Sequence, residues 1–399
     1  MIHRIYFFIK FLCLPLGLAL AVVPALPVHW IVKALAGIAG IPLLLAGALA
    51  FYNIFLSANR SRVSRTLNMD VHSVTHDNMH NSFTDLILFK GRFVLAHAVS
   101  PYHLGNAKSR IVVKVSHNAR DWTEIKSFDM GEDIRDPKLA VIGGRLFLYV
   151  LMNREVQPRP YTTRFSCTGD LVNWTDLEGV GHEGWLFWRP KSLDGRVWYC
   201  PAYWHRFGRT ALFSSTDGIH WDYKAKICSG KVVNESCFEF DPEGNILVAG
   251  RAEYSKKLFP DRLFGNESGS TIISRSEPPY ERFTMCHESA RTRLDGPVLF
   301  KAGERIFAAG RSQPAHDRIF RKTGSIFAKK RTSLYELSDN GLRWITDFPS
   351  AGDTSYCGAV VKDGRVFVSY YTSSLKHDYI WVFGMIEPTQ VMVAEFEIP

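Results

Sequence analysis

Hydrophobic and polar residues are distributed very differently over the first sixty residues and over the rest of the chain. Residues 5–26 and 34–57 are apolar runs in which Lys10 is the only charged residue. Each run is long enough to cross about 30 Å of hydrocarbon as a helix. The first run could also be a secretory signal peptide, since the sequence ALA at 19–21 resembles a cleavage site. The second run would still hold the protein in a bilayer, so we expect one or two N-terminal transmembrane helices within residues 1–65.

After residue 70 the pattern changes to short strands with alternating apolar residues, each preceded by a turn that contains glycine. Such a unit is typical of a β-hairpin, and six copies follow one another. The turn glycines are 49 to 61 residues apart, which is enough for one four-stranded blade each. They are Gly91, Gly144, Gly195, Gly244, Gly303 and Gly364. The sequence therefore predicts an all-β, six-bladed β-propeller over residues 66–399.

A second repeat lies out of phase with the first. The segment from Ser215 to Trp221 fits the pattern S-x-D-x-G-x-x-W, the Asp box, and weaker copies occupy 116–122, 166–174 and 338–344. The Asp or Asn side chain can bond backbone amides of a turn, while the Trp fills the gap between blades. We expect these residues to be structural.

The basic charge of the chain belongs to its N-terminal end. The formal net charge is +9, but six Lys and Arg residues and no acidic residue come before Asp70, so the remainder carries only +3. Nucleic acid is therefore not expected as a partner. Arg60, Arg62 and Arg65 follow the second apolar run directly, which favours a helical hairpin with a cytoplasmic propeller. If only the second run spans, the propeller lies outside.

Ionisable residues recur at matched distances before the turn glycines. In a propeller, the innermost strand of each blade runs towards this turn, so residues six to nine positions earlier should surround the mouth of the central channel. The second strand of a blade returns to the same mouth. The residues placed there include Arg135, Asp136, Arg189, Glu235, Arg251, Asp295, Arg311, Asp353 and Tyr356.

At these residues the chain resembles the sialidase (neuraminidase) superfamily over about residues 76–398. It is similar to a bacterial branch with segments like HNSFTDL, IRDPKL, NES, GP and GDTSY, in this order. The resemblance implies a Tyr nucleophile, Tyr356, activated by Glu235. It also implies that Arg251 and Arg311 are the second and third arginines of a triad that binds the substrate carboxylate. Arg135, Arg189, Asp295 and Asp353 would complete the binding site.

Two positions depart from the family pattern. Asn81-Ser82-Phe83-Thr84 replaces the segment that carries the first arginine, and the loop 99–110, where the general acid is expected, contains no carboxylate. His103 in that loop or Asp136 in blade two would have to supply the proton. Arg251 and Arg311 could instead form structural ion pairs with Asp295 and Glu235, and Asp353 could cap the GDTSY turn.

The sequence thus favours a membrane-tethered, sialidase-like glycoside hydrolase that acts on an acidic glycan or glycolipid at a bacterial inner membrane. The alternative is an inactive, lectin-like propeller that binds anionic glycans. No metal or organic cofactor is expected, because no His, Asp or Cys cluster has the sequence spacing of metal ligands. The loops 252–270 and 312–331 follow the two mouth arginines. The second contains six Lys or Arg residues, so it is a candidate contact for anionic glycans or lipid head groups.

Overall fold

A computed structural model describes the protein as two compact units, Met1–Asn59 and Arg60–Pro399. The described residues are 12–56, 67–152, 162–205, 208–228, 231–253, 269–289, 291–313 and 323–398. Residues 254–268 and 314–322 of the loops 252–270 and 312–331 lie outside these ranges, so the predicted roles of these segments stay predictions. In the described end of the second loop, Lys330 is buried, and Lys329 and Arg331 pair with Asp378 at 3.2 and 2.8 Å. Among the described cysteines no disulfide occurs.

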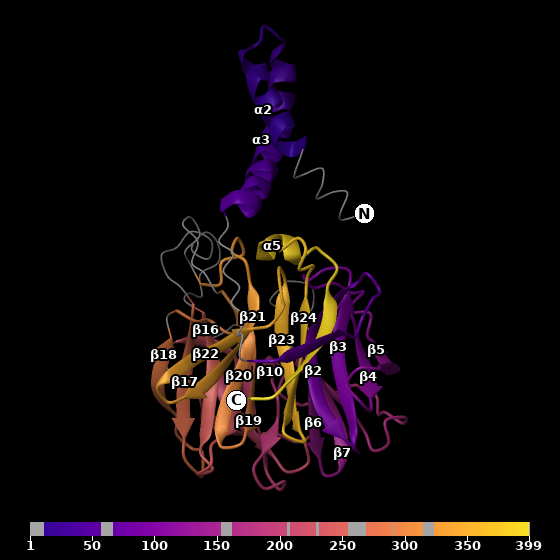
Figure 1. Ribbon diagram of the computed structural model, residues 1–399, viewed down its shortest axis with the longest axis vertical. Helices are drawn as coiled ribbons and strands as arrows, with labels where there is room; N and C mark the ends of the chain where they lie inside the picture. Colours follow the sequence, from indigo (N-terminus) through magenta and orange to yellow (C-terminus); the bar gives the residue numbers. More distant parts are fainter. Residues whose placement is uncertain are drawn as a thin grey trace. The chain divides into compact units, whose positions relative to one another are not determined.

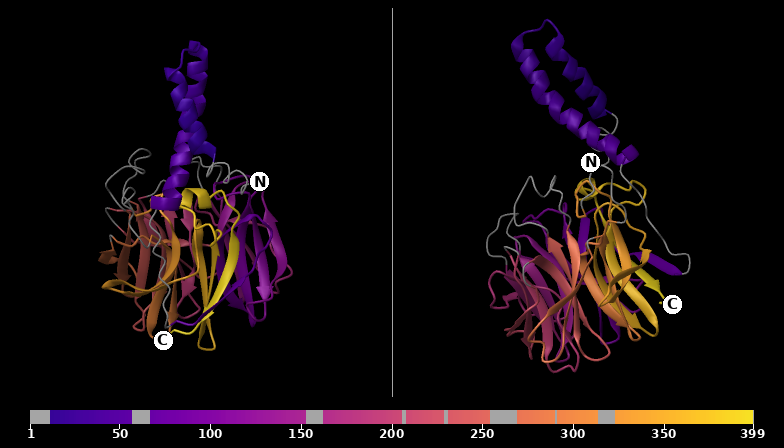
Figure 2. Two further views of the ribbon diagram at one scale, coloured as in Figure 1. Left: turned by 45° about the horizontal axis from the view of Figure 1, so that its top comes forward. Right: turned by 90° about the vertical axis from the view of Figure 1, so that its left-hand side faces the viewer.

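The N-terminal unit consists of α2 (Leu14–Val22), a 3-10 turn (Val23–Ala25), α3 (Trp30–Phe51) and a π-helical turn (Tyr52–Leu56). Figure 2 shows α2 and α3 side by side. A Cβ atom on Gly47 would lie 2.5 Å from the backbone nitrogen of Leu14, so glycine allows this close approach. Among the described residues, one helix, Trp30–Phe55, is long and apolar enough to span a membrane, although a signal sequence passes the same test.

The second unit is a six-bladed β-propeller, as predicted (Figure 1). Blades one and two contain β2 (His80–Phe89), β3 (Arg92–Ser100), β4 (Arg110–Ser116), β5 (Thr123–Asp129), β6 (Ile134–Ile142), β7 (Arg145–Met152), β8 (Thr162–Thr168) and β9 (Glu178–Gly179). Blade three contains β10 (Trp185–Phe187), β11 (Lys191–Ser192), β12 (Trp198–Trp204), β13 (Thr210–Ser215) and β14 (Asp222–Lys226).

Blade four contains β15 (Val232–Phe240), β16 (Ile246–Glu253), β17 (Ser270–Ser276) and β18 (Thr284–Ser289). Blade five contains β19 (Asp295–Ala302), β20 (Arg305–Ser312), β21 (Arg331–Ser338) and β22 (Gly341–Asp347). Blade six contains β23 (Thr354–Lys362), β24 (Arg365–Thr372), β25 (Gln390–Phe396) and β1 (Met69–Ser73), with the one-turn helix α5 (Trp381–Gly384) between β24 and β25. All six turn glycines have φ between +62° and +83°, which L side chains rarely adopt, and this explains the recurrence of glycine.

The last blade is closed by the beginning of the propeller chain. β1 pairs antiparallel with β25, from Met69 opposite Phe396 to Ser73 opposite Met392. The first and the last strand of the propeller chain therefore meet in blade six. Since β25 starts at the mouth, Met69 lies at the opposite end of the propeller.

Most of the innermost strands contain a β-bulge that directs side chains towards the mouth. Each inner strand except that of blade three has a register shift near its first residues, at Ser82/Asp85 in blade one, for example, and at Ser355/Gly358 in blade six. In blade three the strand is broken between β10 and β11. The extra residue of a β-bulge bends the strand and redirects a side chain. Phe83, Asp136 and Tyr356 in these bulges have φ between +48° and +54°.

The segment 215–221 forms a tight turn between the outer strands of blade three. Asp217 Oδ1 accepts hydrogen bonds from the backbone nitrogens of Ile219 and His220, both at 2.8 Å. Trp221 is buried and donates from Nε1 to the carbonyl oxygen of Gly218 at 3.2 Å. Burial opposes ionisation of Asp217, but these contacts and the His220 side chain hold its pKa below the usual range. These residues bond to the turn itself.

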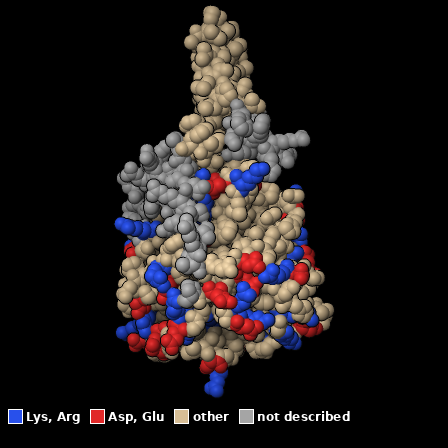
Figure 3. Space-filling model, viewed as in Figure 1, with Lys and Arg blue, Asp and Glu red and all other residues tan. Residues whose placement is uncertain are grey.

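Charges of both signs are interspersed over the propeller face seen in Figure 3, whereas the N-terminal helices show uncharged side chains there. No extended basic surface is visible among the described residues of that view.

The pairing of β1 with β25 yields a test of the closure. Val74 donates to the carbonyl oxygen of Val391 at 2.7 Å, and hydrogen-bonded pairs alternate in an antiparallel ladder. The nitrogen of His72, opposite Val393, therefore faces β25. We expect His72→Pro to lower the free energy of unfolding by roughly 1–3 kcal/mol, since proline removes this donor. His72→Ala keeps the donor and should cost far less in chemical denaturation; equal losses would contradict the pairing.

Candidate functional site

Glu235 and Tyr356 meet at the mouth, although they are 121 residues apart in the sequence. Tyr356 donates its hydroxyl to Glu235 Oε1 at 2.6 Å. Glu235 Oε2 accepts from Arg251 at 2.9 Å and from the backbone nitrogen of Gly296 at 2.7 Å. A Cβ on Gly296 would lie 2.5 Å from the Tyr356 ring, so glycine is needed here. Burial, with the charge of Glu235, raises the pKa of Tyr356 well above its usual value, so the phenol is protonated at rest.

Three arginines converge on Asp295. Its carboxylate accepts from Nε of Arg293 at 2.8 Å and from Nε of Arg311 at 3.1 Å, and Arg251 lies 3.5 Å away. Burial opposes ionisation, but these guanidinium groups outweigh it and hold the pKa of Asp295 below its usual range. Asp295 therefore orients the arginines, and its expected contact with substrate stays a prediction.

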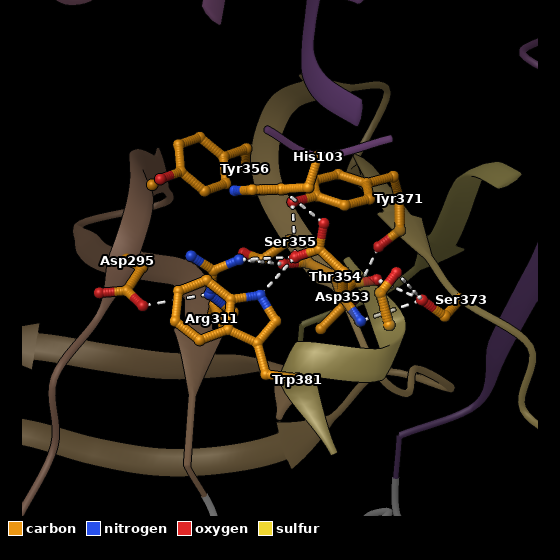
Figure 4. A network of polar contacts seen from close by, with 12 residues as sticks. His103, Asp295, Arg311, Asp353, Thr354, Ser355, Tyr356, Tyr371, Ser373 and Trp381 are labelled. Carbon is orange, nitrogen blue, oxygen red and sulfur yellow. Dashed lines mark hydrogen bonds and ion pairs between the residues drawn. The ribbon is translucent and has the colours of Figure 1, made fainter. Parts of the chain in front are cut away.

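Arg311 bonds two carboxylates and lies close to two aromatic rings (Figure 4). It bonds Asp295, and its NH1 group donates to Asp353 Oδ1 at 2.9 Å. The guanidinium carbon lies 4.2 Å from the ring centroid of Trp381 and 5.3 Å from that of Tyr356. Among the described residues, the NH2 groups of Arg311 and Arg251 have no hydrogen-bond partner. Both predicted ion pairs therefore form, and each arginine keeps a donor.

The carboxylate of Asp353 is completely buried and divides its contacts between its two oxygens. Oδ1 accepts from Arg311, from the Tyr371 hydroxyl at 3.1 Å and from Trp381 Nε1 at 2.7 Å. Oδ2 lies 3.1 Å from Nε2 of His80 and 2.6 Å from Nδ1 of His103. The side chain thus binds five other side chains rather than the turn that we expected it to cap. Its burial also separates it from solvent.

His103 connects the loop after β3 with this carboxylate. Its backbone nitrogen donates to the carbonyl oxygen of Met385 at 2.8 Å, and its side chain is 13% exposed. Its ring centroid lies 5.4 Å from that of Phe83, which in turn lies 4.8 Å from that of Tyr356. His80, His103 and Asp353 place three potential metal-ligand atoms within 4.8 Å of one another, a grouping that their sequence spacing does not reveal.

Arg135 and Asp136 occupy the bulge of blade two. Arg135 pairs with Asp133 at 2.6 Å and lies over the Phe83 ring. Arg135 Nε and Asp136 Oδ1 are buried without a hydrogen-bond partner among the described residues. Burial raises the pKa of Asp136 to about 6, assisted by the charge of Glu235 and opposed by Lys138. Asp136 therefore lies near the Glu235 side of the mouth with an unsatisfied oxygen.

Arg189 has a different place from the one that its sequence position indicates. Its side chain forms two contacts to Asp85, at 2.5 and 3.1 Å, and donates to the carbonyl oxygen of Cys357 at 3.1 Å. Asp85 also accepts from the backbone nitrogen of Leu139 at 2.8 Å. This buried pair ties blades one, two, three and six together. Arg189 therefore contributes to the framework below the mouth.

Sequence reasoning missed two residues of the site, His80 and Trp381. It placed Arg293 at the mouth without giving it a role, and it assigned Lys330 to the basic loop 312–331. Lys330 is buried, donates to Gln313 Oε1 at 2.8 Å and lies 5.5 Å from the Trp381 ring centroid. Trp381 and Lys330 come from connections between strands, so the distance from a turn glycine could not locate them. Arg293 and His80 come ten and eleven residues before Gly303 and Gly91, outside the range of six to nine positions, and a single arginine or histidine carries no specific signal.

No family model matches the sequence, and no curated protein matches it. Solved structures match the fold. A protein of unknown function from Dyadobacter fermentans superposes with a TM-score of 0.63 at 15% identity, over 84% of this chain and 100% of that one. Phage phi92 endosialidase gives a TM-score of 0.60 at 9% identity, over 84% of this chain and 70% of that one.

Trypanosoma rangeli sialidase, solved with sialic acid, gives a TM-score of 0.55 at 10% identity, over 84% of this chain and 59% of that one. This chain has the sialidase fold. The expected sialidase-like propeller is therefore confirmed as an architecture. The chain spans about 60% of the length of that sialidase, and at these identities the likeness concerns the fold.

Asp136 provides a test of whether blade two is built for a ligand. Its folded pKa of about 6 exceeds the unfolded value of about 3.9, so the buried carboxylate destabilises the fold above about pH 6 and has no such effect below pH 4. We expect Asp136→Asn to raise the free energy of unfolding at pH 7.5 by about 1–3 kcal/mol, and not at pH 4. Asparagine also tolerates the φ of +52°.

The control is Asp85→Asn, which weakens the pair with Arg189 and should destabilise the protein at pH 7.5 in the same unfolding measurement. A destabilising Asp136→Asn would show that the carboxylate serves the fold instead.

Proposed function

We propose that the propeller is a sialidase-like glycoside hydrolase that acts on a carboxylate-bearing glycan, with Tyr356 as nucleophile. The contact that carries the proposal is the 2.6 Å hydrogen bond from the Tyr356 hydroxyl to Glu235. Glu235 can accept the phenol proton as the tyrosine oxygen attacks, because Arg251 and the Gly296 nitrogen stabilise its other oxygen. A neutral phenol beside a carboxylate also avoids the repulsion that an anionic nucleophile would have with an anionic substrate.

The arginines support an anionic substrate. Arg251 and Arg311 each keep an NH2 group without a partner among the described residues, and both are oriented by Asp295. Charge-assisted hydrogen bonds from preorganised guanidinium groups are among the stronger polar contacts in proteins. Arg135, in blade two, is a third candidate because its Nε is buried and unpaired.

Unpaired buried polar atoms around the mouth support a ligand rich in hydroxyl groups. Besides Arg135 and Asp136, the amide nitrogens of Asn234 and Gln313 are buried without partners among the described residues. Such atoms are rare in folded proteins unless water or a ligand satisfies them. Sugar hydroxyls both donate and accept, so a glycan can satisfy these three donors and the one acceptor.

The membrane attachment remains part of this proposal. The candidate span Trp30–Phe55 supports a tethered enzyme. The basic residues that follow it favour a cytoplasmic propeller where the first apolar run also spans the membrane. A glycolipid or a membrane-linked glycan is then a suitable substrate. The described residues give no orientation of the propeller with respect to a bilayer.

The hydrolase function is tested with the full chain in detergent and aryl ketosides of sialic acid, followed by a panel of acidic polysaccharides. We expect release of the aglycone or of an acidic sugar. Glu235→Gln and Tyr356→Phe should each lower kcat by at least about 10²-fold, because they remove the base or the nucleophile. Activity that is unchanged in both variants would contradict this assignment of the pair.

Anion recognition is tested through Arg251→Lys and Arg311→Lys. Alanine at position 311 would remove one of the three arginines from Asp295 and the arginine partner of the buried Asp353, at a cost of about 3–5 kcal/mol. Lysine keeps the charge but not the fork of donors. We expect each lysine variant to weaken binding of sialic acid by about 10- to 100-fold in calorimetry. Lys362→Gln, at the partly exposed end of β23 that faces away from the mouth, is the control and should bind normally.

The lectin-like alternative is favoured by one observation, the absence of a carboxylate from the loop 99–110. Stoichiometric binding of an acidic glycan without any product, and with no change in Glu235→Gln, would establish that alternative.

A further inference from the structure

We propose that His103 is the catalytic acid and base of this site, and that Asp353 and His80 position it in a His80–Asp353–His103 relay. The proposal rests on the hydrolase function and assigns the proton transfer to the loop 99–110, which has no carboxylate. It thereby chooses His103 over Asp136, whose unpaired oxygen would then bind a substrate hydroxyl.

The first argument is the protonation of His80. Its Nδ1 lies 2.8 Å from the backbone carbonyl oxygen of Glu387, which can only accept, so Nδ1 carries a proton. Its Nε2 lies 3.1 Å from Asp353 Oδ2, and an ionised carboxylate can also only accept. Two acceptors at this distance would repel each other. The contact therefore requires a proton on or shared with Nε2.

The second argument is the orientation of His103. Its Nδ1 lies 2.6 Å from the same Asp353 oxygen and donates to it, which leaves Nε2 as the nitrogen available to a substrate. Among the described residues Nε2 has no hydrogen-bond partner. Figure 4 shows the His103 ring between those of Tyr356 and Tyr371, above the carboxylate. A carboxylate that fixes the tautomer of a histidine in this way is a recurrent arrangement for proton transfer.

The third argument is electrostatic. The charged groups that face His103 are Asp353, His80 and Arg311. Burial is the largest effect and lowers the pKa of His103, and the two cationic neighbours add to it, whereas Asp353 opposes it. The net pKa lies below the usual value of about 6.5. His103 is therefore neutral at rest above this pH, and its protonated form acts at mildly acidic pH.

The proton balance of the two half-reactions is complete. In the first, the His103 imidazolium gives its Nε2 proton to the departing oxygen as the glycosidic bond breaks. The Tyr356 oxygen bonds to the anomeric carbon, and the phenol proton passes to Glu235. In the second, neutral Nε2 takes a proton from the attacking water. The bond to Tyr356 then breaks, and the phenolate recovers its proton from Glu235.

The relay is tested directly by long-range proton–nitrogen NMR on the full chain in detergent, labelled with 15N-histidine and assigned with His103→Gln. We expect His103 to be the Nδ1–H tautomer at pH 7.5 and to titrate below pH 6.5. His80→Gln removes a cationic neighbour and should raise this midpoint. Tyr371→Phe removes a donor from the other oxygen of Asp353, keeps the tautomer and serves as the matched control. An Nε2–H tautomer, an unchanged midpoint in His80→Gln, or stoichiometric Zn²⁺ binding by this cluster would overturn the proposal.

The catalytic role is tested by leaving-group dependence. With His103→Gln we expect kcat/KM to fall about 10²–10⁴-fold for a methyl ketoside of sialic acid, and much less for the 4-nitrophenyl ketoside, whose phenolate leaves without a proton. Azide should restore turnover by replacing the water that needs a base. If His103→Gln keeps full activity on the methyl ketoside while Tyr356→Phe does not, this assignment alone fails. If the wild-type chain cleaves no ketoside or acidic glycan, the hydrolase function fails as well.

Discussion

The structure of the mouth depends on the pairing of buried carboxylates with buried guanidinium groups. Glu235, Asp295 and Asp353 each accept hydrogen bonds or ion pairs from at least three donors, and Arg311 joins two of them. Removing a charge from water costs several kcal/mol, and only a nearly complete set of partners offsets this cost. The network therefore has little freedom to rearrange. Its arginines are held in place before any ligand arrives, so a ligand would not have to order them.

The network can form because bulges interrupt five of the inner strands at equivalent positions. A regular strand directs alternate side chains to opposite faces of the sheet, and only a local kink can aim one towards the axis. Tyr356 and Asp136 have positive φ in their bulges, a conformation that is costly for residues other than glycine. This conformational cost falls on residues that lie at the mouth. Beyond the bulges, by contrast, the inner strands pair in regular register as far as the turn glycines.

The six turn glycines and the strand alternation were enough to predict the architecture, because both follow from short-range backbone geometry. The matched offsets also brought Glu235, Arg251 and Arg311 to one opening. They failed for Arg189, because blade three has a broken inner strand and no register shift like the others. The offsets could not reveal that one oxygen of Asp353 bonds Arg311 and the other bonds the two histidines. This arrangement depends on Trp381 and His103, which lie in connections between strands and have no fixed distance from a turn glycine. The strand pattern thus predicts which residues lie at the mouth, whereas the loops determine which hydrogen-bond partners those residues have.

The satisfied and the unsatisfied parts of the mouth have different roles. Around Asp295 and Asp353 every carboxylate oxygen has a partner, and this side provides rigidity. In blade two, Asp136 Oδ1 and Arg135 Nε are buried without partners among the described residues, and burial raises the pKa of Asp136 to about 6. A protein gains nothing in stability from such atoms. Their cost is understandable if a polar ligand completes them, because the ligand then contacts groups that water does not already satisfy. The network around Asp295 and Asp353 would fix where an anion binds. Arg135 and Asp136 would form hydrogen bonds with the hydroxyl groups next to that anion.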